Sequence, residues 1–283
     1  MIECRTLEGV SLAQLADTFN RAFSGYFVPI QMTEASLRDK MQAEQTNLTF
    51  SAGAFYDSQL VGILLQGIGY YHGNYCAYNG GTGVFSEFRG QGITQQMYAF
   101  LEPRLKKEGI TKNLLEVITD NEAAIRAYQK AGFTITRTLD CFRGMVKDLS
   151  REAPKTLRLV VDPIEFPWSS VERFGNFLPS WPYTLSAAQR SFPHLTSVVG
   201  FEGHDCVAFG LINTDTGRVY QFGVDPGHRK SGIGYQVFHR MSQLSSRGLS
   251  ILNIDRADQE TIDFLMNVGL EKYISQYEME REL

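Results

Sequence analysis

The sequence predicts an α/β fold made of two similar domains in tandem, and three observations support this prediction. Short apolar segments alternate along the chain with amphipathic segments of helical period. A glycine-rich turn between a predicted strand and a predicted helix occurs twice, starting at Arg89 and again 140 residues later at Arg229. The chain has 283 residues, 43% of them hydrophobic and 20% charged, which suffices to bury two cores.

The overall composition excludes several classes of protein. The formal net charge is -4 and no basic stripe is present, so we expect no nucleic-acid partner. No apolar run approaches the roughly 20 residues that span a bilayer, and Met1–Arg5 lacks the layout of a signal peptide. We therefore expect no membrane partner and a cytoplasmic location. The 4 cysteines lie far apart without a C-x-x-C pair, which favours small buried side chains over metal ligands, and we expect no metal.

The segment before Arg89 predicts two helices and four strands. Ser11 and Thr33 are suited to cap helices, because their hydroxyls can accept from the free N–H groups of a first helical turn. The first helix carries apolar residues at helical spacing from Leu12 to Phe23, and the second is predicted over Glu34–Glu44. The predicted strands are Ile2–Leu7, Leu48–Tyr56, Leu60–Tyr71 and Tyr75–Phe85.

A helix, a strand and a short helix are predicted after the first glycine turn. The helix over Gly90–Glu108 is amphipathic, with Gly109 as its left-handed end. The strand Leu114–Thr119 is apolar on both sides, as a central strand should be. Asp120 or Asn121 then caps a helix over Glu122–Ala131. Two further strands, Phe133–Thr138 and Cys141–Lys147, are predicted to finish the first domain.

The first glycine turn has the features of an anion-binding site. Gly90 and Gly92 let the backbone turn sharply and remove Cβ atoms from the first turn of the helix. The N–H groups of the helix start then have no partner within the helix, and the helix dipole adds positive charge, which favours a phosphate. The turn is not a Walker loop, because no Gly-Lys-Ser/Thr follows it, and it is not a G-x-G-x-x-G fingerprint.

The turn resembles the coenzyme A pyrophosphate loop of the GNAT superfamily of N-acetyltransferases, whose pattern is Arg/Gln-x-x-Gly-x-Gly/Ala. Here it reads Arg89-Gly90-Gln91-Gly92-Ile93-Thr94, and Thr94 stands where the family prefers Gly or Ala. The segment from Asn121 to Phe133 resembles the family's second signature, Asn…Ala…Tyr…Lys…Gly-Phe, with Tyr128 at the tyrosine. The resemblance implies a mixed, mostly antiparallel sheet that is splayed near the coenzyme loop and has helices on both faces.

The second half repeats this pattern incompletely. The predicted strand Val219–Asp225 leads into Arg229-Lys230-Ser231-Gly232-Ile233-Gly234, which matches the family pattern in full and is a possible second coenzyme A site. A helix from Ile233, a strand Leu249–Ile254 and a helix Gln259–Asn267 follow, but Leu265 stands where the first half has Tyr128. Pro163–Pro193 is rich in proline and aromatic residues, with only short helices expected over Ser169–Phe177 and Leu185–Arg190.

The predicted domain boundary is the polar stretch Ser150–Lys155, which contains Pro154. The prediction is therefore a GNAT-like acetyltransferase domain over residues 1–150 and a second GNAT-like domain over residues 155–283 that is degenerate in the later motif.

What the resemblance implies is transfer of an acyl group, usually acetyl, from coenzyme A to an amine. Acetyl-CoA is the implied co-substrate, and the acceptor is a small-molecule or peptide amine. Val84 would offer its N–H to the oxyanion, and Tyr128 would protonate the departing thiolate. The implied coenzyme-binding residues are Gly83, Val84, Phe85, Arg89, Gly90, Gln91, Gly92, Ile93, Thr94, Asn121 and Tyr128.

No residue is marked by the sequence as the general base. Glu116 lies on a predicted strand beside the loop and could act directly or through water, and Glu87 and His72 are further candidates. The first half carries the tyrosine and the asparagine, so we expect it to be the catalytic half. Two other functions stay open: a protein that binds or senses acyl-CoA without turnover, and a structural tandem in which one half mediates homodimerisation.

Overall fold

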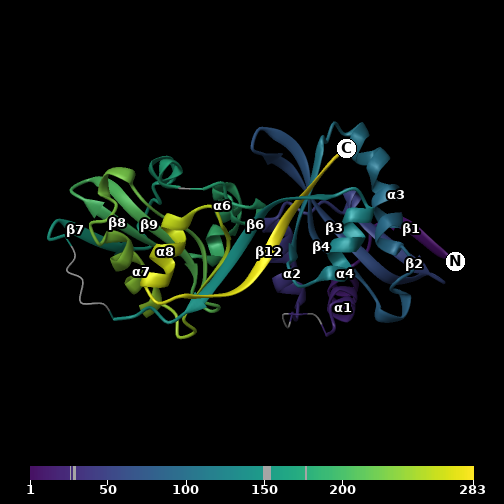
Figure 1. Cartoon of the computed structure of the whole chain (residues 1–283), viewed down its shortest axis with the longest axis horizontal. Coiled ribbons are helices and arrows are strands. Elements are labelled where there is room, and N and C mark those ends of the chain that lie inside the picture. The colour runs from purple at the N-terminus through teal and green to yellow at the C-terminus, as the bar shows by residue number, and fades with distance from the viewer. Residues whose placement is uncertain (26, 28–29, 149–153, 176) are drawn as a thin grey trace. The chain divides into compact units, whose positions relative to one another are not determined.

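The structure is a computed structural model that describes residues 1–25, 27, 30–148, 154–175 and 177–283 (Figure 1). It divides into two compact units: unit 1 holds residues Met1–Arg137 and Tyr277–Leu283, and unit 2 holds Thr138–Gln276. These units differ from the consecutive segments 1–150 and 155–283 that the sequence predicts, because the last residues of the chain belong to unit 1. Most of the predicted linker, residues 150–153, lies outside the described residues.

Unit 1 begins with the elements that the sequence predicts. Ser11 caps the first helix by accepting from the backbone N–H of Gln14, and Thr33 and Ser36 form a capping box at the second. The segment predicted as one strand over Leu48–Tyr56 is a short 3-10 helix followed by a strand. The elements of the unit are β1 (Ile2–Thr6), α1 (Leu12–Ala22), α2 (Glu34–Ala43), η1 (Leu48–Phe50), β2 (Ala52–Tyr56), β3 (Gln59–Tyr71), β4 (Asn74–Val84), η2 (Ser86–Phe88), α3 (Ile93–Lys107), β5 (Lys112–Ile118) and α4 (Glu122–Lys130).

The sheet of unit 1 opens between β4 and β5, the two parallel strands at its centre. Strand neighbours follow the order β1-β2-β3-β4-β5, and β5 is followed by β12 (Glu271–Glu282) and β6 (Thr134–Gly144). The β4–β5 ladder runs only from Cys76 opposite Lys112 to Asn79 opposite Leu115. A register shift in the β3–β4 ladder leaves Gly80 unpaired just beyond this point, so β4 carries a bulge where the sheet opens.

Unit 2 has the same plan but contains strands that periodicity did not reveal. The sequence did not predict β7, β8, β9 or β12. The further elements are β7 (Leu157–Val161), α5 (Trp168–Val171), η3 (Glu172–Phe174), η4 (Trp181–Tyr183), α6 (Leu185–Ser191), η5 (Phe192–His194), β8 (Thr196–Glu202), β9 (Asp205–Asn213), β10 (Arg218–Val224), η6 (Pro226–His228), α7 (Ile233–Gln243), β11 (Leu249–Asp255) and α8 (Gln259–Asn267). Neighbouring strands follow the order β12-β6-β11-β10-β9-β8-β7.

Two long strands contribute to both units. The prediction of two strands after Gly132 is wrong, since β6 is a single strand over Thr134–Gly144. Its first residues belong to unit 1, and its later residues pair antiparallel with β11 in unit 2. In the same way β12 begins in unit 2, and its last residues fill the place beside β5 in unit 1. Each unit therefore takes one strand segment from the other half of the chain.

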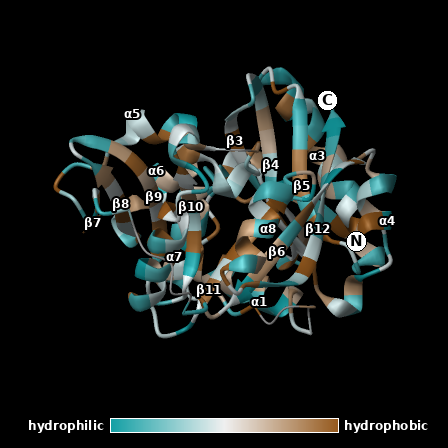
Figure 2. Ribbon diagram, turned by 60° about the vertical axis from the view of Figure 1, so that its left-hand side comes forward, coloured by the Kyte–Doolittle hydropathy of each residue, from teal (hydrophilic) through white to brown (hydrophobic). Residues whose placement is uncertain are grey.

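Each unit has its own hydrophobic cores. In unit 1, the α3 side of the sheet buries Met97, Tyr98, Leu101 and Tyr128 among others, and α1 and α2 cover the opposite face. In unit 2, α7 packs on the sheet through residues such as Phe238. Figure 2 shows hydrophobic colour along many strands, whereas the C-terminal end of β12 is hydrophilic. Within the described part of the chain, no helix has the length and apolarity needed to cross a bilayer.

Candidate active site

The first glycine loop has the open helix start that its sequence predicts. It connects β4, which ends at Val84, to α3, which begins at Ile93. Gly90 and Gly92 have φ angles of +78° and +71°, in the left-handed region that favours glycine. No side chain caps α3. The first N–H groups of this helix are therefore placed to receive an anion, and the helix dipole adds to the attraction.

Arg89 holds the loop in place through hydrogen bonds to two backbone carbonyls. Its Nε donates to the carbonyl of Val84 at 3.0 Å, and its Nη2 donates to the carbonyl of Ala22 at the end of α1 at 2.8 Å. This arrangement ties the end of β4 to α1. The guanidinium acts first as a structural tie, a role that the sequence did not indicate.

The small residues before the loop make room for the protein's own side chains. A Cβ atom at Gly83 would lie 2.7 Å from the Cβ of Ala22, and one at Gly81 would lie 3.1 Å from the ring of Phe19. At Gly80 a Cβ would collide with the carboxylate of Glu44. The run from Gly80 to Gly83 is thus explained by close packing of α1 and α2 against β4.

Tyr128 lies on the α3 side of the opening between β4 and β5. Its side chain is 8% exposed, and its ring makes edge contacts with Tyr98 and Phe133 at centroid distances of 6.4 and 6.0 Å. The hydroxyl of Tyr98 stays protonated, because burial raises its pKa far above the usual value. The same hydroxyl accepts from Asn79 Nδ2 at 2.7 Å. Asn121 caps α4 by accepting from the N–H of Ala124 at 3.2 Å.

Glu116 lies on the opposite face of the sheet from Tyr128. Leu115 and Val117 pack in the same core as Tyr128, and side chains alternate along a strand, so Glu116 points to the other face. There the hydroxyl of Tyr78 on β4 donates to the carboxylate of Glu116. The candidate acid and the candidate base therefore flank the opening of the sheet from its two sides.

The two other candidates for the base lie elsewhere. Glu87 forms an exposed ion pair with Arg21 at 2.5 Å. His72 occupies the turn between β3 and β4 with a φ of 49°, and its ring contacts Tyr71 at a centroid distance of 3.9 Å. Neither side chain is shown at the opening between β4 and β5.

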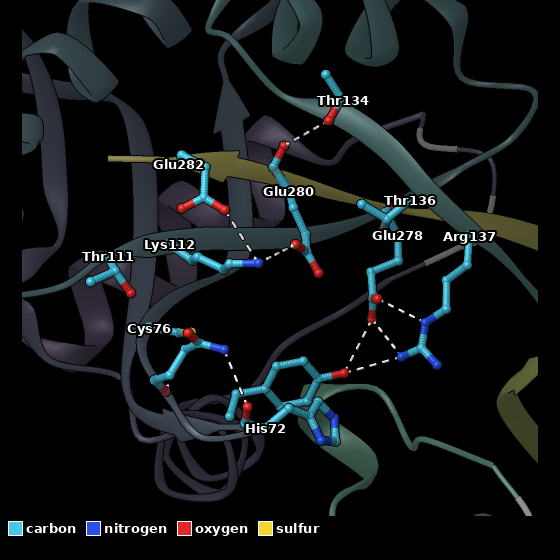
Figure 3. A network of polar contacts seen from close by, with 12 residues as sticks. His72, Cys76, Thr111, Lys112, Thr134, Thr136, Arg137, Glu278, Glu280 and Glu282 are labelled. Atoms are coloured by element: carbon cyan, nitrogen blue, oxygen red, sulfur yellow. Dashed lines mark hydrogen bonds and ion pairs between the residues drawn. The ribbon is translucent and has the colours of Figure 1, made fainter.

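An ion-pair network joins β5 and β6 of unit 1 to the end of β12 (Figure 3). Arg137 holds Glu278 in a two-point contact, with Nε–Oε1 at 2.7 Å and Nη2–Oε2 at 2.8 Å. Arg137 Nη2 also donates to the hydroxyl of Tyr71 at 3.1 Å. Further along β12, Lys112 binds Glu280 at 3.1 Å and Glu282 at 3.3 Å. The residues that complete this network come from the far end of the chain, and sequence reasoning missed all of them.

The second glycine loop repeats the geometry of the first. Lys230 and Gly232 have φ angles of +61° and +89°, and no side chain caps α7. Arg229 donates to the carbonyls of Val224 and Phe174, both at 3.2 Å, as Arg89 does in unit 1. Both loops are therefore built as helix starts with free N–H groups.

Unit 2 contains a cavity of about 1100 Å³ that begins at this second loop. Its walls are the end of β10, the middle of β11, faces of α7 and α8, and residues within the segments 171–175 and 177–185. The volume is slightly above the usual range of small-molecule sites, roughly 300–1,000 Å³. The sequence did not reveal this cavity, because the segment that closes it has no regular period.

Unit 2 lacks both candidate catalytic groups at the equivalent places. The ladder between its parallel strands ends at Val219 opposite Ile251, and the next residues of β11 are Leu252 and Asn253, so no carboxylate follows as Glu116 does in unit 1. On α8 the position of Tyr128 is taken by Leu265, which is 0% exposed. Unit 2 thus has a cavity beside its loop, and unit 1 has the two titratable side chains that the sequence proposes as acid and base.

These features define the class of protein: an α/β fold in which an anion-binding loop adjoins the point where two parallel strands diverge. Residues 12–133 match the model of the acetyltransferase (GNAT) family. The match identifies this segment as a GNAT-type domain, and it supports acyl-CoA-dependent N-acyltransferase chemistry in general. No curated protein matches the chain in sequence.

Solved structures show that the tandem arrangement is shared. A tandem GNAT protein from the clavulanic acid biosynthesis pathway superposes with a TM-score of 0.74 at 13% identity, over 100% of this chain and 98% of that one. A GCN5-related N-acetyltransferase from Sphaerobacter thermophilus gives 0.72 at 15% identity over 99% and 95%. A putative acetyltransferase from Pyrococcus horikoshii gives 0.70 at 14% over 100% and 89%. At these identities the likeness shows the fold, which is that of two GNAT domains in one chain.

Proposed function

We propose that the chain is an N-acetyltransferase whose unit 1 transfers acetyl from acetyl-CoA to a primary amine of a small molecule or peptide. The observation that carries this proposal is the placement of Glu116 and Tyr128 on opposite faces of the opening between β4 and β5. The loop from Arg89 to Thr94 ends beside the same opening. A thioester held there meets a base on one side and an acid on the other.

The reaction follows from this placement. Glu116 takes a proton from the ammonium form of the acceptor, directly or through water, and leaves a neutral amine. The nitrogen lone pair attacks the thioester carbonyl, and the backbone N–H of Val84 stabilises the oxyanion that forms. The carbon–sulfur bond then breaks, and Tyr128 protonates the departing thiolate. The nitrogen of the intermediate loses its second proton, which returns Tyr128 to its neutral form directly or through water. The products are the amide and free coenzyme A, with Glu116 carrying the first proton taken from the amine.

We assign unit 2 a binding role without turnover. Its loop has the geometry of an anion site and its cavity accommodates an extended ligand, but it offers Leu252, Asn253 and Leu265 where unit 1 offers the base and the acid. This assignment also covers the second candidate function, a protein that senses acyl-CoA. The two units then divide catalysis and sensing within one chain.

The test measures free thiol released from acetyl-CoA in the presence of a panel of small amines and peptide N-termini. The wild-type chain is expected to release thiol with at least one amine, and Glu116→Gln is expected to lower the rate by a factor of about 10²–10⁴. Glu87→Gln, which removes an exposed carboxylate, serves as the matched control. Binding of acetyl-CoA with no release for any amine would leave only the sensing role, and equal rates for both variants would remove Glu116 from the mechanism.

A further inference from the structure

Two arginines lie on one face of the unit 2 sheet without a carboxylate partner. Arg143 on β6 and Arg218 on β10 are both paired with Ser250 on the strand between them, so all three side chains share a face. Two strand spacings place the arginines about 10 Å apart. Among the described residues, neither arginine has an ion pair with an acidic side chain. Like charges so placed repel each other, and an anion between them would offset this repulsion.

Arg218 is held in place by neutral groups. Its Nη1 donates to the hydroxyl of Tyr183 at 2.8 Å, and its Nε donates to Ser250 Oγ at 3.1 Å. The other terminal nitrogen, Nη2, has no partner within the described ranges. Arg143 lies over the ring of Tyr273, with its Cζ 4.6 Å from the centroid. Arg143 is exposed, but Arg218 is partly buried, and a partly buried guanidinium with neutral neighbours is costly unless a ligand supplies the negative charge.

Tyr183 connects this charge to the cavity. It lines the cavity wall, together with Tyr220 and Gln221. Its hydroxyl accepts from Arg218, so its own proton remains to be donated, and no acceptor for it exists among the residues that the structure describes. The side chain of Gln221 donates to the backbone carbonyl of Tyr183, which fixes the position of the residue. The cavity wall therefore includes the hydroxyl of Tyr183, which can donate its proton and which itself contacts the Arg218 guanidinium.

This part of the cavity is distinct from the part at the second glycine loop. Arg218 opens β10, and Val224 closes it before the glycine loop, so the two ends are about 20 Å apart along the strand. In unit 1 the residue at the place of Arg218 is Tyr78, which donates to Glu116. Unit 1 thus has a tyrosine bonded to a carboxylate here, whereas unit 2 has an arginine and no carboxylate. This difference favours a negatively charged ligand group at this end of the unit 2 cavity.

We propose that the cavity of unit 2 binds a carboxylate-bearing ligand, with the carboxylate accepting from the hydroxyl of Tyr183 in the cavity wall and with the charge of Arg218, which donates to that hydroxyl, favouring the anion. The carboxylate could come from a free dicarboxylic acid or from the end of an acyl chain on coenzyme A, as in succinyl-CoA. The second form rests on the proposed function, since it places the coenzyme at the second glycine loop. The first form stands without it.

Intrinsic fluorescence provides the test, because both tryptophans of the chain lie in unit 2. Trp181 is buried, and it begins the short η4 helix that ends at Tyr183. The full chain is titrated with acetyl-CoA, succinyl-CoA, succinate, acetate and inorganic phosphate. Succinyl-CoA is expected to bind at least tenfold more tightly than acetyl-CoA. A response to succinate alone identifies a free dicarboxylate as the ligand, and equal affinity for the two thioesters with no response to succinate overturns the proposal.

Three variants test the assignment to Tyr183 and Arg218. Arg218→Met and Tyr183→Phe are expected to lose the preference for the carboxylate at least tenfold. Arg158→Met is the matched control, because Arg158 is exposed in the same unit and lies over the ring of Phe201, and its preference is expected to stay within twofold. Tyr183→Phe retains the aromatic ring, so its ligand preference tests the proposal even if Arg218→Met does not fold. An unchanged preference in Tyr183→Phe contradicts the proposal.

The same variants separate this inference from the proposed function. Thiol release in unit 1 depends on Glu116 and Tyr128, so Tyr183→Phe is expected to retain the release rate measured without a carboxylate ligand. Binding of succinate by a chain that never releases thiol would defeat the proposed function and support the inference. Thiol release by a chain that neither distinguishes the two thioesters nor responds to succinate would do the reverse.

Discussion

Replacing Glu278 by alanine is expected to destabilise unit 1 by about 3–5 kcal/mol, because it leaves Arg137 without its partner. The side chains of Glu278 and Arg137 are 6% and 14% exposed, and they meet in a two-point contact at 2.7 and 2.8 Å. Removing one member of such a pair costs far more than the pair itself contributes, since the remaining guanidinium is still buried. Tyr71 loses an acceptor at the same time.

The magnitude is large on the scale of the whole protein. Domains of this size unfold with about 5–15 kcal/mol, and each kcal/mol shifts the melting temperature by about 2–4 °C. A loss on the order of 10 °C is therefore expected for the transition of unit 1. The matched control is Glu282→Ala on the same strand, whose side chain is 74% exposed and whose contact with Lys112 is 3.3 Å. An exposed pair of this kind contributes about 0–1 kcal/mol.

Urea unfolding followed by circular dichroism measures both variants, and a double variant tests the cause. Arg137→Met together with Glu278→Leu removes both charges and is expected to recover most of the stability lost in Glu278→Ala. A loss below about 1 kcal/mol in Glu278→Ala would refute the reasoning. So would a double variant no more stable than the single one, since the cost would then not arise from an unpaired charge.

Three further predictions concern the site and the thiols. Tyr128→Phe is expected to lower turnover by a factor of about 10² or more with little change in coenzyme affinity, measured by thiol release and by titration, and unchanged turnover would exclude Tyr128 as the acid. Gly92→Val is expected to abolish coenzyme binding by unit 1, because a branched residue is strained at a φ of +71°, whereas Gly232→Val is expected to act on unit 2 alone. Burial raises the pKa of the Cys76 thiol to about 11, so only about 0.1% is thiolate at pH 8 and alkylation of the native protein should be slow; rapid labelling of Cys76 would contradict its burial.

Much of the fold could be predicted from the sequence because it depends on local chemistry. The hydroxyl and amide caps at Ser11, Thr33 and Asn121 are formed as predicted, because a cap needs only the side chain and the next turn of backbone. The glycines at 90, 92 and 109 have positive φ for the same local reason. Several strands were predicted near their observed bounds, but β7, β8, β9 and β12 were not, and β9 was missed although Cys206–Ile212 is a continuous run of small and apolar residues.

Only part of the candidate site could be predicted from the sequence. The glycine loop and the positions of Glu116 and Tyr128 follow from motif and order along the chain. Their placement on opposite faces of the opening depends on the alternation of β5 around the point where its ladder with β4 ends, which is a property of the sheet. The roles of Arg89 and of the glycines before the loop depend on what α1 and α2 bring against them.

The sequence by itself determined the fold class, the repeat and the two glycine loops, because short-range geometry governs turns, caps and amphipathic faces. Only the tertiary structure decided that β6 and β12 are shared, that Glu278 meets Arg137 and that Tyr183, which accepts from Arg218, lies in the cavity wall of unit 2. The contact between Arg137 and Glu278 joins residues 141 positions apart, and that between Lys112 and Glu280 joins residues 168 positions apart. Their energy depends on burial and on the sign of neighbouring charges, and neither is set until the strands are in register.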